Sequence, residues 1–190
     1  MRTRRPPSRI RWALGAVVLL LAFLTFLFLR GPAFVQRYYY PLEHESAIRE
    51  SAERHEINPY LVAAVVNAES GWDPDVVSDA DAVGLMQVLP ETAAEMRELG
   101  LVEASASDDL SDPATNIEYG TAYLRYLVER YHEIETALAA YNAGIANADD
   151  WAKQGGDIRD AIEFPETKHF VLRVARARDV YERLYPDAFE

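Results

Sequence analysis

A carboxylic acid stands at the end of one of the most apolar stretches of the chain. Glu69 closes the segment Ala-Ala-Val-Val-Asn-Ala-Glu, and Gly71 follows at the expected end of a helix. Burial among such neighbours disfavours the charged form of a carboxyl group and raises its pKa, so the group can stay protonated near neutrality and act as a general acid. A single Glu on a helix is more often a solvated surface residue, and the position alone leaves both interpretations open.

Two further segments place polar side chains where little else is polar. Gln87 lies in the apolar run 82–90, shortly after Gly84, which permits close approach of the backbone. Tyr141 and Asn142 stand side by side among alanines. An amide inside an apolar run needs hydrogen-bond partners. The acetamide and hydroxyl groups of a sugar would serve, and so would the protein backbone.

The segments that must position these residues are expected to be helical. Asn58 can cap a helix that begins at Pro59. A second helix is expected to begin at Asp112-Pro113, because apolar residues then recur at steps of three and four. Residues 136–143 are predicted to form a short helix of small residues, and Pro165 to begin the last one. Since no alternating strand longer than a few residues is predicted, the sequence indicates a mainly α domain whose helices bury apolar stripes on one another.

The charge of the chain is divided sharply along its length. No Asp or Glu precedes Tyr38, whereas seven Arg do, so residues 38–190 hold the other 12 basic residues against all 31 acidic ones, a balance of −19. A unit this acidic would repel nucleic-acid phosphates, so nucleic acid is excluded as a partner. It would also be repelled by anionic wall polymers, and charge by itself therefore does not deliver it to them.

Residues 12–29 form an uncharged, apolar run of 18 residues. As a helix it would span about 27 Å, close to the ~30 Å hydrocarbon core of a bilayer. Arginines precede it at positions 2, 4, 5, 9 and 11, and the positive-inside rule then places residues 1–11 in the cytoplasm and the rest of the chain outside. A cleaved signal peptide is the rival interpretation, but its apolar core is usually about 7–15 residues long. We therefore expect a single-pass membrane anchor.

Behind this anchor, residues 30–43 are expected to form a stalk and residues 44–190 the working domain. Fourteen extended residues reach at most about 50 Å, so the domain would act close to its membrane. The stalk contains Tyr38, Tyr39 and Tyr40. These rings either sit at the membrane interface, which aromatic side chains favour, or pack on the domain.

Five groups of residues between positions 45 and 185 resemble one enzyme family. They are Glu69 to Pro74 (ESGWDP); Gly84 to Gln87 (GLMQ) with Pro90 and Thr92-Ala93; Asn116-Ile117 with Gly120 and Tyr123-Leu124; Ala137 to Gly144 (ALAAYNAG) with Trp151; and Phe164 to Thr167 (FPET) with Val171. In this order they are similar to those of the lytic transglycosylases of the soluble-transglycosylase (SLT) type. The resemblance implies a lysozyme-like (goose-type) helical domain that acts on peptidoglycan glycan strands.

The resemblance also implies roles for single residues. It assigns Glu69 as the one catalytic acid/base, in a cleft lined by Ser78, Gln87, Tyr141, Asn142 and Glu166. Ser78 would contact the acetamide of the substrate, and Tyr141 would orient Glu69. Asn142 and Glu166 match positions that either bind substrate or support the structure.

The chain departs from the family pattern in three places. Asp81 stands where the family commonly has Gly, in a turn that Asp can still adopt because it tolerates left-handed backbone. Ile145-Ala146 replaces a usual Arg-Val pair, which removes a basic residue from one end of the expected cleft. Phe170 replaces a common Tyr and lacks its hydroxyl. None of these changes removes the acid.

The reaction implied by the resemblance cleaves the MurNAc-β-1,4-GlcNAc bond and leaves 1,6-anhydroMurNAc, with the sugar's own acetamide in place of a second carboxylate. Ordinary glycosidases use two carboxyl groups. Because Asp73, Asp75, Asp79 and Asp81 follow Glu69 closely, a second carboxylate that holds a water would make the enzyme a hydrolytic muramidase. A non-catalytic glycan-binding module is the third possibility. No cofactor is expected, and no metal, since the four histidines lack short ligand spacing.

Overall fold

A computed structural model describes residues 9–30, 33–103 and 106–190. The chain forms two compact units, which divide between Tyr39 and Tyr40. Most of the expected cytoplasmic segment 1–11 lies outside the described residues.

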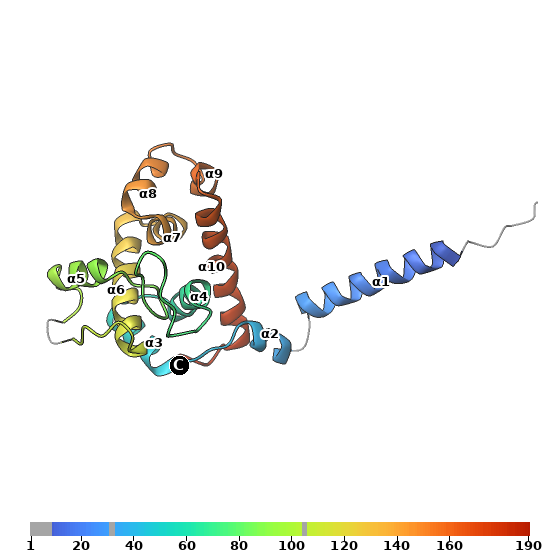
Figure 1. Ribbon diagram of the computed structural model, residues 1–190, viewed down its shortest axis with the longest axis horizontal. Helices are drawn as coiled ribbons and strands as arrows, with labels where there is room; N and C mark the ends of the chain where they lie inside the picture. The colour runs from blue at the N-terminus through green and yellow to red at the C-terminus, as the bar shows by residue number, and fades with distance from the viewer. Residues whose placement is uncertain (1–8, 31–32, 104–105) are drawn as a thin grey trace, which may run out of the picture. The chain divides into compact units, whose positions relative to one another are not determined.

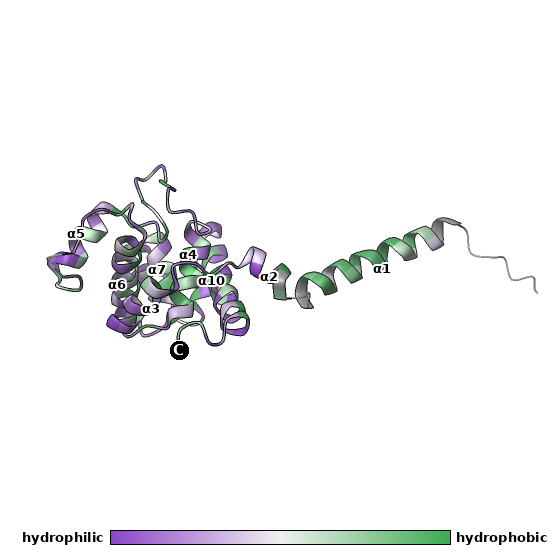
Figure 2. Ribbon diagram, turned by 90° about the horizontal axis from the view of Figure 1, so that it is seen from below, coloured by the Kyte–Doolittle hydropathy of each residue, from purple (hydrophilic) through white to green (hydrophobic). Residues whose placement is uncertain are grey.

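In its described residues, the first unit has the helices α1 (Arg9–Arg30) and α2 (Ala33–Tyr39) (Figure 1). The helix α1 contains the expected apolar run, and its large apolar side chains are exposed; Leu19, for example, is 73% exposed. Figure 2 shows apolar residues along this helix. Within the described part of the chain, no helix meets the combined requirements of length and apolarity for crossing a bilayer. The expected stalk 30–43 includes the short helix α2.

The second unit is mainly helical, as predicted. Its helices are α3 (Glu45–Arg54), α4 (Pro59–Glu69), α5 (Pro90–Glu98), α6 (Pro113–Tyr131), α7 (Ile134–Ala143), α8 (Ile145–Ala152), α9 (Ile158–Ala161) and α10 (Pro165–Leu184). In Figure 1, α4 and α7 lie between α6 and α10, and α5 lies on the outer side of α6. The helix α10 packs on both α4 and α7, while α3 packs on α4 and α6.

The helix α4 lies at the centre of the second unit because it has no polar face. Residues 61–66 are all at most 2% exposed, which is typical of a helix that is apolar on every side. The predicted cap is confirmed, since the Asn58 side chain accepts hydrogen bonds from the Tyr60 and Leu61 amides at 2.8 and 3.3 Å. The predicted start of α6 is confirmed too, because Asp112 accepts a hydrogen bond from the Thr115 amide. Glu69 is thus the last residue of a helix that the core holds on all sides.

The three neighbouring tyrosines differ in their environment. The Tyr40 ring meets the Tyr181 ring at 5.9 Å between centroids, and the Tyr40 carbonyl accepts a hydrogen bond from the Tyr185 hydroxyl at 2.9 Å. Tyr38 and Tyr39 are 80% and 57% exposed. Tyr40 therefore packs on the second unit, which begins before the boundary expected at residue 44.

Candidate active site

Glu69 is partly buried at the C-terminal end of α4. Burial is the main reason that its pKa rises from 4.5 to about 7; Arg173 opposes the rise, and Glu166 adds to it. The C-terminal end of a helix also disfavours negative charge, in the same direction as burial. A large fraction of Glu69 is therefore protonated at neutral pH, as a proton donor to a leaving group must be.

Two residues of α10 lie close to the end of α4. Arg173 donates a hydrogen bond from Nη2 to the Ala68 carbonyl at 3.0 Å, and its guanidinium carbon lies 6.0 Å from the centre of the Phe170 ring. Glu166, in the first turn of α10, is exposed but near enough to raise the pKa of Glu69. Arg173 was not singled out from the sequence, because a basic residue on an exposed helix face carries no motif signal.

The loop 70–89 between α4 and α5 carries two of the predicted site residues and is fastened at its start. The Ser70 hydroxyl donates to the Leu85 carbonyl at 2.9 Å and accepts a hydrogen bond from the Trp72 amide at 3.1 Å. The Trp72 indole donates to the Tyr181 hydroxyl at 2.9 Å, which ties the loop to α10. Isolated β-bridges join Val83 to two other valines of the loop, in place of regular strands.

Asn116 fastens the middle of this loop from the first turn of α6. It is 1% exposed, and its side chain accepts from the Met86 amide at 2.7 Å while donating to the Val83 and Leu110 carbonyls at 2.7 and 2.9 Å. Gly84 permits this approach, because a Cβ there would lie 2.6 Å from the Asn116 amide nitrogen. The sequence motif included Asn116 without giving it a role, and the structure makes it a positioning residue for the loop.

The sequence left two kinds of hydrogen-bond partner open for Gln87, a sugar or the protein backbone, and in the structure its amide nitrogen binds the backbone. Its Nε2 donates hydrogen bonds to the carbonyls of Val76 and Gly84, both at 3.0 Å, and its backbone φ is 49°. The amide nitrogen is thus occupied by the loop itself. The amide oxygen remains available to accept a hydrogen bond from a ligand.

Ser78 holds the turn that contains Asp81. The Ser78 hydroxyl oxygen accepts hydrogen bonds from the Ala80 and Ala82 amides at 3.3 and 3.1 Å. Asp81 has a φ of 62°, so it adopts the left-handed backbone that the replacement of Gly required. The oxygen of Ser78 is engaged by the turn, and its proton is left for a ligand.

Tyr141 lies at the centre of an aromatic group beside Glu69. Its ring stacks on Phe170 with 6.4 Å between centroids and tilts against Tyr123 at 5.3 Å. Its hydroxyl donates to the Met86 carbonyl at 2.8 Å. Burial, with the nearby Glu69 charge as a second cause, raises the pKa of Tyr141 well above 10, which keeps the hydroxyl protonated. Since its one proton goes to Met86, Tyr141 can meet Glu69 only as a hydrogen-bond acceptor.

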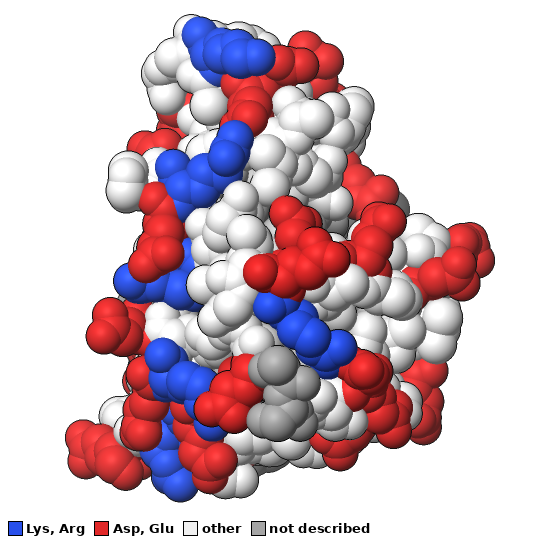
Figure 3. Space-filling model, turned by 90° about the vertical axis from the view of Figure 1, so that its left-hand side faces the viewer, with Lys and Arg blue, Asp and Glu red and all other residues white. Residues whose placement is uncertain are grey.

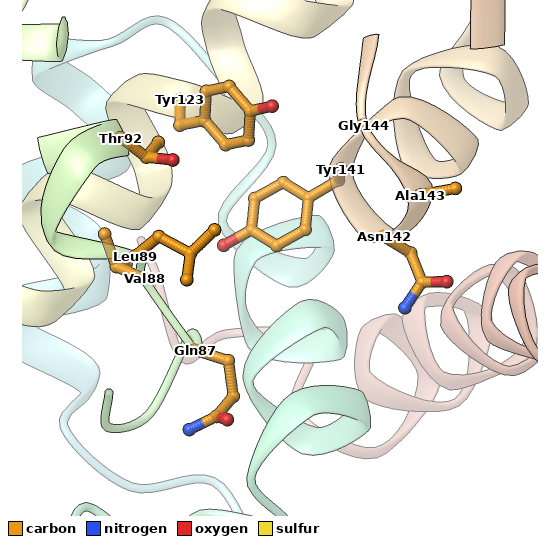
Figure 4. Close-up of a pocket in the computed structure, with 9 residues that line it drawn as sticks. All are labelled: Gln87, Val88, Leu89, Thr92, Tyr123, Tyr141, Asn142, Ala143 and Gly144. Carbon is orange, nitrogen blue, oxygen red and sulfur yellow. The ribbon is translucent and has the colours of Figure 1, made fainter. Parts of the chain in front are cut away.

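A pocket of about 290 Å³ opens beside these residues, near the lower end of the ~300–1,000 Å³ range of ligand sites (Figure 4). Its lining is Gln87, Val88, Leu89, Thr92, Tyr123, Tyr141, Asn142, Ala143 and Gly144. Figure 4 shows Tyr141 in the middle of this group, with Tyr123 above it and Gln87 and Asn142 below. The structure thus brings together three of the predicted residues, with Glu69 next to Tyr141. Ser78 lies apart from this lining, in the turn of the loop.

The four aspartates that follow Glu69 in sequence, Asp73, Asp75, Asp79 and Asp81, are all exposed on the loop. The carboxyl group whose charge does reach Glu69 belongs to Glu166, which is distant in sequence. Among the residues described, no three His, Cys, Asp or Glu side chains are placed to hold a metal ion.

The sequence profile of the transglycosylase SLT domain matches residues 46–163, more than half of the chain. The chain belongs to the SLT transglycosylase family. The matched part of the SLT domain contains Glu69, Ser78, Gln87, Tyr141 and Asn142, whereas α10, with Glu166 and Arg173, lies beyond it.

Individual relatives agree with this assignment. The soluble lytic murein transglycosylase of Escherichia coli (strain K12) is 32% identical over 154 residues, which cover 77% of this chain and 24% of the relative. The membrane-bound lytic murein transglycosylase C of Histophilus somni (strain 2336) is 36% identical over 107 residues, or 51% of this chain and 30% of the relative. The chain spans about a quarter of the length of the first of these curated relatives.

The fold of the SLT domain is also that of a solved enzyme. The lytic transglycosylase Slt of Pseudomonas aeruginosa, solved as an inactive mutant with Gln in place of a Glu, superposes with a TM-score of 0.69. The two share 28% identity, over 76% of this chain and 24% of that one. The expectation of a mainly helical, lysozyme-like SLT fold is confirmed.

Proposed function

We propose that this chain is a peptidoglycan lytic transglycosylase that cleaves the MurNAc-β-1,4-GlcNAc bond and leaves 1,6-anhydroMurNAc ends. The observation that carries the proposal is the state of Glu69, a partly buried carboxyl group with a pKa of about 7. It lies beside Tyr141, which lines a pocket with Gln87 and Asn142. The names of the relatives, all lytic transglycosylases, support the same reaction.

In the proposed reaction Glu69 acts twice. Protonated Glu69 first gives its proton to the glycosidic oxygen, and the bond from this oxygen to C1 of MurNAc breaks. The acetamide oxygen of the same sugar stabilises C1 in place of a carboxylate. The Glu69 carboxylate then takes the proton of the sugar's 6-hydroxyl as that oxygen bonds to C1. The acid is restored, and no water is consumed.

The hydrogen bonds of the neighbouring residues suggest what each offers the substrate. The Ser78 oxygen accepts from two backbone amides, so its free proton can go to the acetamide carbonyl that we place there. The Gln87 amide nitrogen is bound to the loop, which leaves its oxygen to accept from a sugar hydroxyl. The Tyr141 hydroxyl can accept from protonated Glu69 and so hold the acid in one orientation. Asn142 lines the pocket and supplies a further amide.

A hydrolytic muramidase is the second candidate, and Glu166 is the observation that favours it. Its carboxylate is exposed yet close enough to act on the pKa of Glu69. A carboxylate on the far side of the scissile bond could activate water, as in inverting glycosidases. Against this role, the charge of Glu166 raises the pKa of Glu69 and so favours the protonated form of that same acid.

Mass spectrometry of the products separates the two reactions. We expect muropeptides released by the full chain from purified sacculi to end in 1,6-anhydroMurNAc, which is one water lighter than a reducing end. Reducing ends as the main product would assign the hydrolytic reaction and contradict ours. If the sacculi stayed intact after prolonged digestion at pH 6, the remaining interpretation would be a non-catalytic glycan-binding module.

We also propose that residues 12–29 hold the enzyme in the cell membrane, with residues 1–11 in the cytoplasm and the catalytic unit outside. Support comes from the exposed apolar side chains of α1, from the arginines that precede it in sequence, and from a relative named as membrane-bound. Because the expected stalk of residues 30–43 is short, the catalytic unit would reach only glycan close to the membrane.

The anchor predicts that the mature chain in cells keeps its N-terminus. Edman sequencing of the membrane fraction should begin at or near Met1, and protease added to protoplasts should degrade the catalytic unit. Leu20→Arg should move a large part of the chain out of the membrane fraction, since Arg at a helix centre costs about 2.5–3.5 kcal/mol in insertion. The control is Leu20→Ala. A soluble form that begins between residues 31 and 40 would show cleavage and refute the anchor.

A further inference from the structure

The basic side chains of the second unit fall into two groups. Most have a carboxylate within ion-pair distance, namely Arg54, Arg97, Arg125, Arg130, Lys153, Arg159 and Arg178. On the face shown in Figure 3, Lys and Arg side chains accordingly lie next to Asp and Glu. In a unit this acidic, such pairing is the ordinary state of a basic residue.

Most of the exceptions lie on the helix α10, although Arg49 on α3 and Lys168 on α10 also have no carboxylate at ion-pair distance within the described chain. Arg173, Arg176 and Arg183 are exposed, and within the described chain none of them has a carboxylate at ion-pair distance. Their spacing of three and seven residues places them on one side of the helix. From Arg173 to Arg183 the helix rises about 15 Å. We name these three residues the α10 stripe.

The acidic groups near the α10 stripe are Glu166, Glu182, Asp187 and Asp179, the last of which stands three residues after Arg176 and four before Arg183. Asp179 pairs with Arg178 at 3.0 Å, and Glu182 accepts a hydrogen bond from Asn58 at 3.2 Å. Glu166 lies in the first turn of the helix, towards Glu69. Since no carboxylate of the described chain lies at ion-pair distance from the three arginines, their guanidinium groups can bind a carboxylate from outside.

The α10 stripe begins at the proposed reaction centre. Arg173 donates to the carbonyl of Ala68, the residue before Glu69. Arg176 and Arg183 then lead away from that point along the helix. A substituent that leaves the glycan beside Glu69 on this side would meet Arg173 first and the other two in turn.

We propose that the α10 stripe binds the carboxylates of the peptide branches carried by the glycan that is being cut, an inference that rests on the proposed function. Arginine suits this ligand, because its planar guanidinium binds a carboxylate through two parallel hydrogen bonds. An extended peptide of four residues covers about 14 Å, which matches the length of the stripe. Salt largely screens the negative charge of the rest of the unit beyond ~8 Å, so the local positive charge of the stripe determines whether a carboxylate binds there.

The same charges would orient the substrate. Elsewhere on the unit, acidic side chains repel a carboxylated branch, whereas α10 attracts it. A branched glycan strand therefore enters the cleft preferentially with its peptide towards α10. The net charge of −19 hides this feature, since it averages one basic stripe with a large excess of acid.

The test measures binding of the full chain, in detergent, to purified sacculi freed of other wall polymers. All proteins carry Glu69→Gln, so the sacculi stay intact. One batch is untreated, and in the other the peptide carboxylates are converted to neutral amides. We expect the double substitution Arg176→Gln and Arg183→Gln to weaken binding to untreated sacculi about three- to tenfold at low salt, with a smaller effect at high salt. On amidated sacculi the parent and the double variant should bind alike.

A matched control is Arg49→Gln on α3, which removes an arginine that also lacks an ion pair in the described chain; its effect is compared with that of Arg176→Gln alone. Equal binding of parent and double variant to untreated sacculi would overturn the proposal, as would an equal loss on both batches. The proposal would also be overturned if the double substitution weakened binding only to vesicles with anionic lipid and not to sacculi. The two proposals can fail separately. If the chain with Glu69 intact produced no anhydro ends but its binding still depended on the peptide carboxylates, the proposed reaction would be wrong and the binding role of the α10 stripe would be supported.

Discussion

Replacing Glu69 by Gln is expected to lower the release of muropeptides by at least about 10²–10⁴-fold. The amide has nearly the shape of the carboxyl group but cannot deliver a proton to the glycosidic oxygen, and general acid catalysis contributes a factor of this size. The rate is measured as soluble product released from sacculi at pH 6, where most of Glu69 is protonated. A rate near that of the wild type would show that another group is the acid.

The stability of the same variant provides the control for its fold. The pKa of Glu69 is about 7 in the folded chain and 4.5 when unperturbed, so between these values the folded state holds a proton that the unfolded state has lost. The free energy of unfolding of the wild type therefore falls as pH rises through this window. Gln does not titrate, and the variant should become the more stable protein by about 1–3 kcal/mol above pH 7.

Urea unfolding at pH 4.5 and pH 8 tests this sign. We expect the advantage of Glu69→Gln to be small at pH 4.5 and larger at pH 8. Glu98→Gln, at the exposed end of α5, should change stability by less than about 0.5 kcal/mol at either pH. An advantage that did not grow with pH would mean that Glu69 is not held in its protonated form.

The sequence predicted the position of Glu69 well because the reason is local. The apolar residues 61–66 leave α4 no polar face, so it must be central, and Asn58 and Pro59 define where it begins. The acid then falls at the end of a buried helix, where its pKa rises. Local composition was sufficient for the helix and its cap, whereas the sequence alone left open whether Glu69 is buried or solvated.

The partners of the site residues could not be predicted in the same way. Asn116 looks like an ordinary polar residue in the first turn of a helix, and its hydrogen-bond partner Met86 lies 30 residues away. Tyr141 gives its proton to a backbone carbonyl 55 residues away and not to Glu69. Such pairs depend on how the loop 70–89 folds against α6 and α7. A net charge similarly carries no information on which basic residues lack a partner.

The second large effect is expected for Asn116→Leu. Leucine branches at the same carbon as asparagine and is the larger residue, so the substitution leaves no cavity while three hydrogen bonds are lost. The Met86 amide and the Leu110 carbonyl would be left buried without a partner, while the Val83 carbonyl would keep its hydrogen bond from the Val88 amide. Each such group costs about 1–3 kcal/mol, and we expect the free energy of unfolding to fall by about 3–5 kcal/mol. Urea denaturation at 15 °C measures the loss.

Activity should fall further than stability accounts for, because Asn116 holds the backbone on either side of Leu85 and so sets the position of Gln87. At 15 °C, where a chain of ordinary stability stays mostly folded, the variant should still lose most of its turnover of sacculi. The control is Asn147→Leu, which removes one amide hydrogen bond, to the Ala143 carbonyl on the preceding helix, and should cost about 1 kcal/mol or less with activity retained. If Asn116→Leu cost no more than this control, the loop would be held mainly by Ser70 and Trp72, and the role assigned to Asn116 would be wrong.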